Sequence, residues 1–204
     1  KISIITATWN SGATLRDTLE SVLQQSYTNY EILIIDGGSS DNTHDIVEEY
    51  IPKFDGRLHW HTGKDKGLYD AMNKGIARAT GDIIGILNSD DFYADSDVLS
   101  RIAEECRNVE AVYGDLDFVD ASDTSRVVRQ WRGSQHRPGA FLKGWHPAHP
   151  TFYARRKCYE RLGGFDISFD VSADFELMLR FLEANRLSNR YIPHTFVKMR
   201  MGGE

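Results

Sequence analysis

Two adjacent carboxylates directly follow an apolar stretch in the first half of the sequence. The stretch is Ile83-Ile84-Gly85-Ile86-Leu87, and Asn88-Ser89-Asp90-Asp91 comes next. An apolar strand that ends in acids places them at the carboxyl edge of an open sheet, where α/β proteins bind ligands. Hard oxygen ligands there suit Mg²⁺ or Mn²⁺ shared with a phosphate-bearing substrate. Asp90 and Asp91 are therefore candidate metal ligands, and the alternative is a turn that precedes a helix over about Asp97 to Asn108.

A third carboxylate ends another apolar strand, Ile32-Leu33-Ile34-Ile35. Asp36 is followed by Gly37-Gly38-Ser39-Ser40-Asp41, so glycines permit close approach of the backbone. A carboxylate after the second strand of a mononucleotide-binding unit can accept hydrogen bonds from ribose hydroxyls or a base N–H. The alternative is an ordinary glycine-rich turn in which Asp41 caps the next helix.

The polar segment Lys64 to Gly75 precedes and enters a predicted helix. Lysines and a helix N-terminus favour phosphate, and the glycine at Gly67 lies before the helix start. Asp65 and Asn73 can hydrogen-bond sugar or base groups. The alternative is an amphipathic surface helix whose charged residues face water.

One acid near the carboxyl end has the features of a general base. Gly163-Gly164-Phe165-Asp166 leads to Ala173-Asp174, and Asp174 falls in the first turn of a predicted helix. The helix dipole would favour its ionised form, which a base that accepts a proton from an alcohol requires. The alternative is that Asp174 only complements the dipole.

Aromatic and basic residues gather between these motifs and the end of the chain. Trp145, His146 and His149 could line a sugar-binding groove, although histidines flanked by proline are also common structural residues. Arg155-Arg156-Lys157 could face a lipid phosphate or simply be a solvated charge run.

A competing motif lies in the middle of the chain. Asp115-Leu116-Asp117-Phe118-Val119 fits DxDx[TV], which resembles haloacid-dehalogenase-type phosphatases with Asp115 as nucleophile. Those proteins carry the motif on their first strand, whereas several βα units precede it here. The phosphatase hypothesis therefore ranks low.

Alternating strands and helices must position these residues. The predicted elements are strands at 2–6, 32–35, 58–60 and 83–87 with helices at 14–25, 43–50 and 68–79 between them, then a strand at 127–128, a helix at 173–185 and a strand at 190–199. This order predicts an α/β fold with a parallel sheet covered on both faces. The irregular stretch from about Asp117 to Pro150 is predicted to form loops that build a second binding surface.

Composition narrows the class of protein. The 204 residues suffice for one domain, and the net charge of −6 argues against a general nucleic-acid binder. Cys106 and Cys158 are too few for a disulfide framework, and no apolar run of about 18 residues occurs, so a soluble cytoplasmic protein with buried thiols is expected. Neither GxGxxG nor GxxxxGK[ST] is present, which removes support for dinucleotide and P-loop sites.

The motifs taken together resemble one family. Ala7-Thr8-Trp9-Asn10, Asp36 with Asp41, Lys64 to Gly75, Asn88 to Asp91, Gly163 to Asp166 and Ala173-Asp174 follow one another as in the inverting family 2 glycosyltransferases with a GT-A fold. The resemblance spans nearly the whole chain. It implies a Rossmann-like, mostly parallel sheet flanked by helices in a single domain over 1–204. Residues 1–112 would bind the nucleotide sugar and 113–204 the acceptor.

The resemblance also implies roles for individual residues. The donor-binding set would be Ala7, Thr8, Trp9, Asn10, Asp36, Asp65, Gly67, Asn73, Ser89 and Asp90, with Mn²⁺ or Mg²⁺ held at the diphosphate by Asp90 or Asp91, and Asp174 would be the catalytic base. The sequence departs from the family pattern at Asn88 and Ala173, where acids are usual. Neither departure removes the key carboxylate.

The expected activity follows from these roles. The protein would move a sugar from a nucleotide-diphosphate donor, by default a UDP-sugar, to a saccharide or lipid-linked saccharide hydroxyl, inverting the anomeric centre in one metal-assisted displacement. Polysaccharide biosynthesis in the cytoplasm or at the inner face of the cytoplasmic membrane is the expected setting, and peripheral membrane contact stays open. The alternatives are a non-catalytic nucleotide-sugar or carbohydrate-binding module and the phosphatase that would use Asp115 and Asp117.

Overall fold

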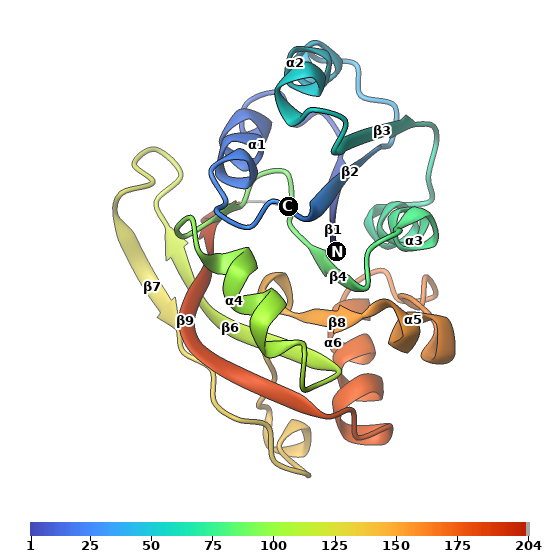
Figure 1. Cartoon of the computed structure of the whole chain (residues 1–204), viewed down its shortest axis with the longest axis vertical. Helices are drawn as coiled ribbons and strands as arrows, with labels where there is room; N and C mark the ends of the chain where they lie inside the picture. Colours follow the sequence, from blue (N-terminus) through green and yellow to red (C-terminus); the bar gives the residue numbers. More distant parts are fainter. Residues whose placement is uncertain (203–204) are drawn as a thin grey trace.

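A single curved sheet with helices on both faces forms the framework of the protein (Figure 1). The computed structural model describes residues 1–202. Within them the strands are β1 (Ile2–Thr8), β2 (Tyr30–Asp36), β3 (Leu58–Thr62), β4 (Ile83–Ile86), β5 (Phe92–Tyr93), β6 (Ala111–Val119), β7 (Val127–Trp131), β8 (Tyr153–Arg155) and β9 (Asn189–Arg200). The helices are α1 (Leu15–Leu23), α2 (Thr43–Tyr50), α3 (Leu68–Arg78), α4 (Val98–Glu105), α5 (Arg156–Leu162) and α6 (Ala173–Met178). Short 3-10 turns cover Ile51–Phe54, Phe141–Lys143 and His149–Thr151.

The first half of the sheet is parallel, as the βα alternation predicts. Strands β3, β2, β1 and β4 lie side by side in that order, with Ile4 of β1 opposite Ile32 of β2 and Gly85 of β4. Parallel strands end at one edge, so the turns after β1, β2, β3 and β4 meet there. This edge carries most of the residues that the sequence predicts to bind the donor or a metal ion.

Alternate residues of the central strands pack against different helices. Ile4, Ile32 and Ile34 contribute to the core shared with α1, α2 and α4. Ile5, Leu33 and Ile35 contribute to the core shared with α3, α5 and α6. The near-continuous apolar strands are therefore buried on both faces, as parallel strands between two helical layers require.

The second half of the sheet is mixed. Strand β8 pairs antiparallel with β4 and β6, and β6 pairs parallel with β9, whereas β7 and β5 add antiparallel pairs at β6 and β9. The sequence predicts β7 and β9 but not β8, whose three residues lack a recognisable pattern. β8 is buried because it lies between β4 and β6.

Several element boundaries differ from the predicted ones. The helix predicted over 173–185 is α6 followed by a π-helical turn, Leu179–Ala184, and the helix predicted near 97–108 is α4, Val98–Glu105. Asp41 is not the N-cap of α2; that position is Asn42. Asp41 Oδ1 instead accepts a hydrogen bond from the Thr43 N–H at 3.0 Å, as in an Asx turn.

The basic run Arg155-Arg156-Lys157 serves the fold at its first two positions. Arg155 donates to the carbonyl oxygens of Val109 and Arg107, and Arg156 donates to the carbonyl oxygen of Gly81. Both cysteines are free and buried, as expected. No helix within residues 1–202 is long and apolar enough to cross a membrane.

Candidate functional site

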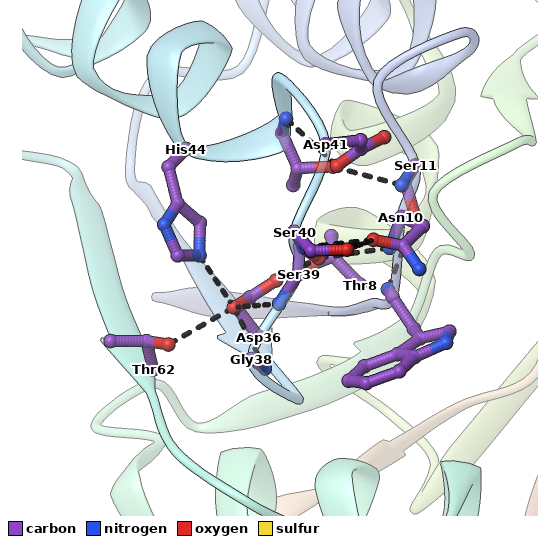
Figure 2. A network of polar contacts seen from close by, with 12 residues as sticks. Thr8, Asn10, Ser11, Asp36, Gly38, Ser39, Ser40, Asp41, His44 and Thr62 are labelled. Carbon is purple, nitrogen blue, oxygen red and sulfur yellow. Dashed lines mark hydrogen bonds and ion pairs between the residues drawn. The ribbon is translucent and has the colours of Figure 1, made fainter.

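Side-chain hydrogen bonds tie together three turns at the carboxyl edge of the parallel strands, and Figure 2 shows those that join the turns after β1 and β2. Asn10, in the turn after β1, has a φ of 49° and accepts a hydrogen bond from the Ser40 N–H at 2.9 Å. The Asp41 carboxylate accepts one from the Gly12 N–H, also at 2.9 Å. The Ser11 hydroxyl lies 2.8 Å from the Ser89 hydroxyl in the turn after β4. Segments separated by up to 78 residues therefore form one rigid surface.

Asp36 is the centre of this network. Its side chain is 0% exposed. Oδ2 accepts hydrogen bonds from the Gly38 and Ser39 N–H groups, each at 3.0 Å, and also contacts Thr62 and His44. Oδ1 accepts from the hydroxyls of Thr8 and Ser39. Burial alone raises the pKa of Asp36, but hydrogen bonds led by those from Ser39 and His44 outweigh it and hold the pKa well below its ordinary value.

This saturation bears on the prediction that Asp36 binds the nucleoside. Because protein groups already donate to both oxygens of the carboxylate, a base or ribose would have to replace one of these donors. Thr62 is exposed and His44 partly exposed, whereas Thr8 and Ser39 are buried. The nucleoside contact stays a prediction. The role that the contacts establish for Asp36 is to hold the turns after β1, β2 and β3 in place.

Asp36→Asn is expected to lower the free energy of unfolding by about 3 kcal/mol, because it removes the buried charge that strengthens these hydrogen bonds and replaces one accepting oxygen by an NH₂ donor. Urea denaturation at pH 7 measures this difference. The pKa of Asp36 is depressed on folding, so its stabilisation is present above its ordinary pKa of 3.8 and is lost as the pH falls below that value. A difference below about 0.5 kcal/mol, the size of an ordinary surface substitution, would contradict this role.

An indole and a carboxylate lie on either side of a glycine turn at this edge. Trp9 is 60% exposed, and a Cβ placed on Gly37 would lie 3.0 Å from Trp9 Cε3 and 2.7 Å from Asp65 Oδ2. The other Asp65 oxygen accepts a hydrogen bond from the Gly67 N–H at 3.0 Å. Gly37 thus allows Trp9 and Asp65 to approach each other. The structure brings together Trp9, Asp36 and Asp65 from three separate turns.

The loop Asn88 to Asp91 is held from two sides. The Thr14 and Thr18 hydroxyls of the α1 region donate to the carbonyl oxygens of Ser89 at 2.9 Å and Asp91 at 2.7 Å. Arg200, at the end of β9, donates to the carbonyl oxygen of Asp90 and pairs with Asp17. Asp90 itself is partly exposed, so its carboxylate can reach a ligand.

Asp91 differs from Asp90 in its surroundings. Asp91 is 0% exposed, and Asn88 Nδ2 donates to its Oδ2 at 3.1 Å. Burial raises the pKa of Asp91 to about 8, the charge of Asp90 adds to the rise, and hydrogen bonding from Asn88 together with Arg200 opposes it. Within the described residues, Asp91 Oδ1 and Asn88 Oδ1 are buried without a hydrogen-bond partner. These two buried oxygens lie next to Asp90 in the sequence, and each could still accept a hydrogen bond or contact a cation.

These oxygens fit a hard divalent cation. Among residues 1–202 no group of three His, Cys, Asp or Glu side chains has the arrangement of a complete metal cage. Magnesium-type sites usually need only one or two carboxylates because waters and substrate phosphates supply the other ligands. The burial of Asp91 points to Asp90 as the main candidate ligand.

Asp174 lies in the first turn of α6 beside two residues from elsewhere in the chain. The Tyr69 hydroxyl of α3 donates to Asp174 Oδ1 at 3.3 Å. His149 is 8% exposed; burial lowers its pKa, and the nearby charge of Asp174 opposes the shift. Burial of His149 agrees with the structural alternative for this proline-flanked histidine and not with a place on an open groove. Its ring and that of Phe165 pack nearly perpendicular to each other, with centroids 5.4 Å apart.

Aromatic rings surround the residue that follows Asp174. Phe175 contacts Phe141 and His146 with centroid distances of 5.5 and 5.3 Å. Trp145 packs on Phe141 and His136. A cavity of about 420 Å³ opens next to Trp145 and is also lined by Arg137 and Lys143. The loops predicted to form a second binding surface thus reach the neighbourhood of Asp174.

Two other predicted positions have structural partners. The Asn73 amide bonds to the backbone of Phe165 rather than facing the turns after β1 and β2. Asp115 accepts hydrogen bonds from the Tyr191 hydroxyl at 2.7 Å and the Gly133 N–H at 2.8 Å, and Arg132 pairs with Asp117 at 2.8 Å. An enclosed and hydrogen-bonded Asp115 is a poor nucleophile, so the geometry does not favour the phosphatase hypothesis.

Sequence reasoning missed three residues that shape the site: Tyr69, His149 as a neighbour of Asp174, and Arg200. Tyr69 lies within the polar segment Lys64 to Gly75, which the sequence already singles out as a candidate part of the site. Arg200 is 110 residues from Asp90, and no local pattern links the two.

Comparison with known proteins gives an independent view of the same residues. Residues 3–168 match the family model described as Glycosyl transferase family 2. A "PGL/p-HBAD biosynthesis glycosyltransferase" from Mycobacterium bovis (strain BCG / Pasteur 1173P2) is 32% identical over 193 residues, which cover 93% of this chain and 73% of the relative. The putative glycosyltransferase EpsE of Bacillus subtilis is 29% identical over 190 residues, which cover 90% and 67%.

Solved structures share the fold at lower identity. S. aureus TarS 1-349 in complex with UDP-GlcNAc has a TM-score of 0.80 at 18% identity, covering 100% of this chain and 59% of that chain. The mannosyltransferase PcManGT from Pyrobaculum calidifontis, in complex with GDP-Man and Mn²⁺, has a TM-score of 0.71 at 20% identity, covering 94% and 54%. The chain thus spans less than two thirds of these structures, and the likeness concerns the fold.

Proposed function

Because this chain belongs to glycosyl transferase family 2 and has the GT-A fold of that family, we propose that it moves a sugar from a nucleotide-diphosphate donor to an acceptor hydroxyl with inversion. One observation carries the proposal. Trp9, Asp65 and Asp90 gather at the carboxyl edge of the parallel strands, while Asp174 lies in a separate aromatic environment beyond α3. A donor site and an acceptor site with a base are what such a transfer needs.

The donor would lie along the turns after β1, β2 and β4. The exposed face of Trp9 suits stacking with a base, and the free Asp65 oxygen can accept a hydrogen bond from the nucleoside. Ala7 and Thr8 are buried at the end of β1, so they would shape the floor of the site. Uridine diphosphate is the default nucleotide, and a UDP-sugar the default donor.

Trp9→Ala is expected to raise the dissociation constant for UDP by about 5- to 150-fold, because stacking of a base on an aromatic side chain contributes about 1–3 kcal/mol. Isothermal titration calorimetry with Mn²⁺ present measures the change. Trp9→Phe should recover part of the affinity because it keeps an aromatic face. Equal UDP affinities of the wild type and Trp9→Ala would show that the indole does not contact the donor.

Asp90 would hold Mn²⁺ or Mg²⁺, with Asn88 or Asp91 oxygens as secondary partners and Ser89 nearby. When bound, the cation would neutralise part of the negative charge that develops on the departing diphosphate. Arg200 and the α1 hydroxyls would keep the loop in place through its carbonyl groups.

Asp174 would act as the base. The acceptor oxygen forms a bond to the anomeric carbon while the bond from that carbon to the diphosphate oxygen breaks. The acceptor proton passes to an Asp174 oxygen, and the nucleoside diphosphate leaves on the opposite face. A single displacement of this kind inverts the anomeric centre.

The acceptor would be a saccharide or a lipid-linked saccharide. Phe175, His146 and Trp145 are partly exposed, so they could present aromatic surface to a sugar ring. Just before α6, Ile167, Phe169 and Val171 expose apolar side chains that suit an apolar part of an acceptor.

A panel of nucleotide sugars, scored by nucleoside diphosphate release with and without Mn²⁺ and with candidate acceptors, tests the proposal. Release that requires both a donor and an acceptor supports a transferase. Donor binding without release under any acceptor would identify a binding module instead.

A further inference from the structure

Helix α3 holds the predicted donor loop through one pair of residues spaced by a helical turn. Asp70 and Lys74 form an ion pair at 2.9 Å. Asp70 also accepts a hydrogen bond from the Lys66 N–H at 3.0 Å, and Lys74 Nζ donates to the carbonyl oxygen of Lys64 at 2.8 Å. Residues four apart share one side of a helix. This pair therefore fixes the segment that contains Asp65.

The preceding residues, Tyr69 and Asn73, are also four apart and hold a different segment. Asn73 Nδ2 donates to the Phe165 carbonyl oxygen at 2.8 Å, and Asn73 Oδ1 accepts from the Phe165 N–H at 2.8 Å. A Cβ on Gly164 would lie 2.2 Å from Asn73 Oδ1, so the close approach requires glycine there. The Asn73 amide thus satisfies both backbone groups of Phe165.

Tyr69 extends this attachment to Asp174. Its ring stacks on Phe165 with centroids 5.4 Å apart and an interplanar angle of 26°, and its hydroxyl reaches Asp174 Oδ1. Burial raises the pKa of Tyr69 and the Asp174 charge adds to the rise, so the phenol stays a donor at neutral pH. The hydrogen bond engages one carboxylate oxygen, Oδ1, and the other remains for an acceptor.

The segment that leads into α6 is exposed and has no side-chain cap. Ser172, at its N-cap, has a φ of 70° and makes no side-chain cap hydrogen bond. The residues from Asp166 to Ser172 are all exposed. Buried Ala173 and Leu177 anchor the helix itself, whereas the side-chain hydrogen bond to the Asp174 carboxylate comes from Tyr69 of α3.

We propose that Tyr69 and Asn73 are positioning residues for Asp174, so that α3 joins the donor loop to the catalytic base. The proposal rests on the proposed function, in which Asp174 is the base. Because both segments are attached to the same helix, α3 would fix the position of the donor loop relative to Asp174.

Tyr69→Phe is the main test, since it removes one oxygen and keeps the stacked ring. We expect kcat for transfer from a UDP-sugar to fall about tenfold or more while the KM for the donor stays within about twofold. Tyr50→Phe is the matched control. It removes a hydroxyl that donates to Glu20 at 2.5 Å between α2 and α1, outside the site, and it should leave kcat unchanged.

A double-mutant cycle with Asp174→Asn separates positioning from a general loss of structure. If Tyr69 acts through Asp174, Tyr69→Phe should cost less than about twofold in the Asp174→Asn background. The full tenfold loss in both backgrounds would overturn the proposal, as would a wild-type kcat for Tyr69→Phe. Full activity of Asp174→Asn alone would instead overturn the proposed function.

Asn73→Ala provides a second variant that distinguishes positioning from donor contact. Positioning predicts a fall in kcat of about tenfold with an unchanged donor KM. A donor contact, as the sequence suggests, predicts a raised donor KM with a kept kcat, and this outcome would overturn the Asn73 part of the proposal. Circular dichroism and thermal unfolding show whether each variant is folded and as stable as the wild type.

Discussion

Asp174→Asn is expected to lower kcat for glycosyl transfer by about 10²- to 10⁴-fold while UDP binding stays at the wild-type level. The amide keeps the shape of the side chain and can still accept the hydrogen bond that Tyr69 directs at Oδ1. It cannot take a proton from the acceptor hydroxyl. Steady-state transfer rates and calorimetric UDP affinity, measured on the same preparations, separate the two effects.

Asp45→Asn is the control that isolates the helix-dipole explanation. Asp45 lies in the first turn of α2 as Asp174 lies in the first turn of α6, and Asp45 is exposed. Both substitutions remove a charge that favours a helix N-terminus, an effect of about 0.3–1 kcal/mol on stability. Only Asp174→Asn should affect the rate. Equal rates for the two variants would mean that Asp174 merely complements the dipole.

Asp90→Asn is expected to lower kcat/KM by about 100-fold or more and to weaken the response to Mn²⁺, because it removes the accessible charged oxygen of the Asn88 to Asp91 loop. Asp91→Asn should have a smaller effect on metal response. Asp91 is fully buried and its Oδ2 is held by Asn88, so its carboxylate is less accessible to a donor than that of Asp90. Manganese titrations of transfer rate on both variants give the comparison.

Asp55→Asn is a suitable reference for these two variants. Asp55 is exposed, lies after α2, and has a φ of 49° that asparagine also tolerates. It should keep the wild-type manganese response. A stronger loss in Asp91→Asn than in Asp90→Asn would contradict the assignment of Asp90 as the main ligand and would make the orphaned Asp91 Oδ1 the better candidate.

The parallel half of the fold could be predicted because its signals are local. Apolar runs such as Ile32 to Ile35 specify strands that are buried on both faces, and helical periodicity between them specifies crossovers. Carboxyl ends of such strands must meet at one edge, so Trp9, Asp36 and Asp90 could be placed together before their contacts were known. The three-residue strand β8 could not be predicted, since its pairing with β4 and β6 depends on partners far away in sequence.

The sequence by itself determined which side chains can do chemistry and, through the order of strands and helices, which of them share an edge. Only the tertiary structure decided how each is used. Asp36 and Asp91 look alike as acids after apolar strands, yet six protein contacts surround the first, while one oxygen of the second has no partner among residues 1–202. Asp174 obtains its hydrogen bond from Tyr69, 105 residues earlier. Burial and donors control the charge of a carboxylate, and both are set by segments that meet only when the chain folds.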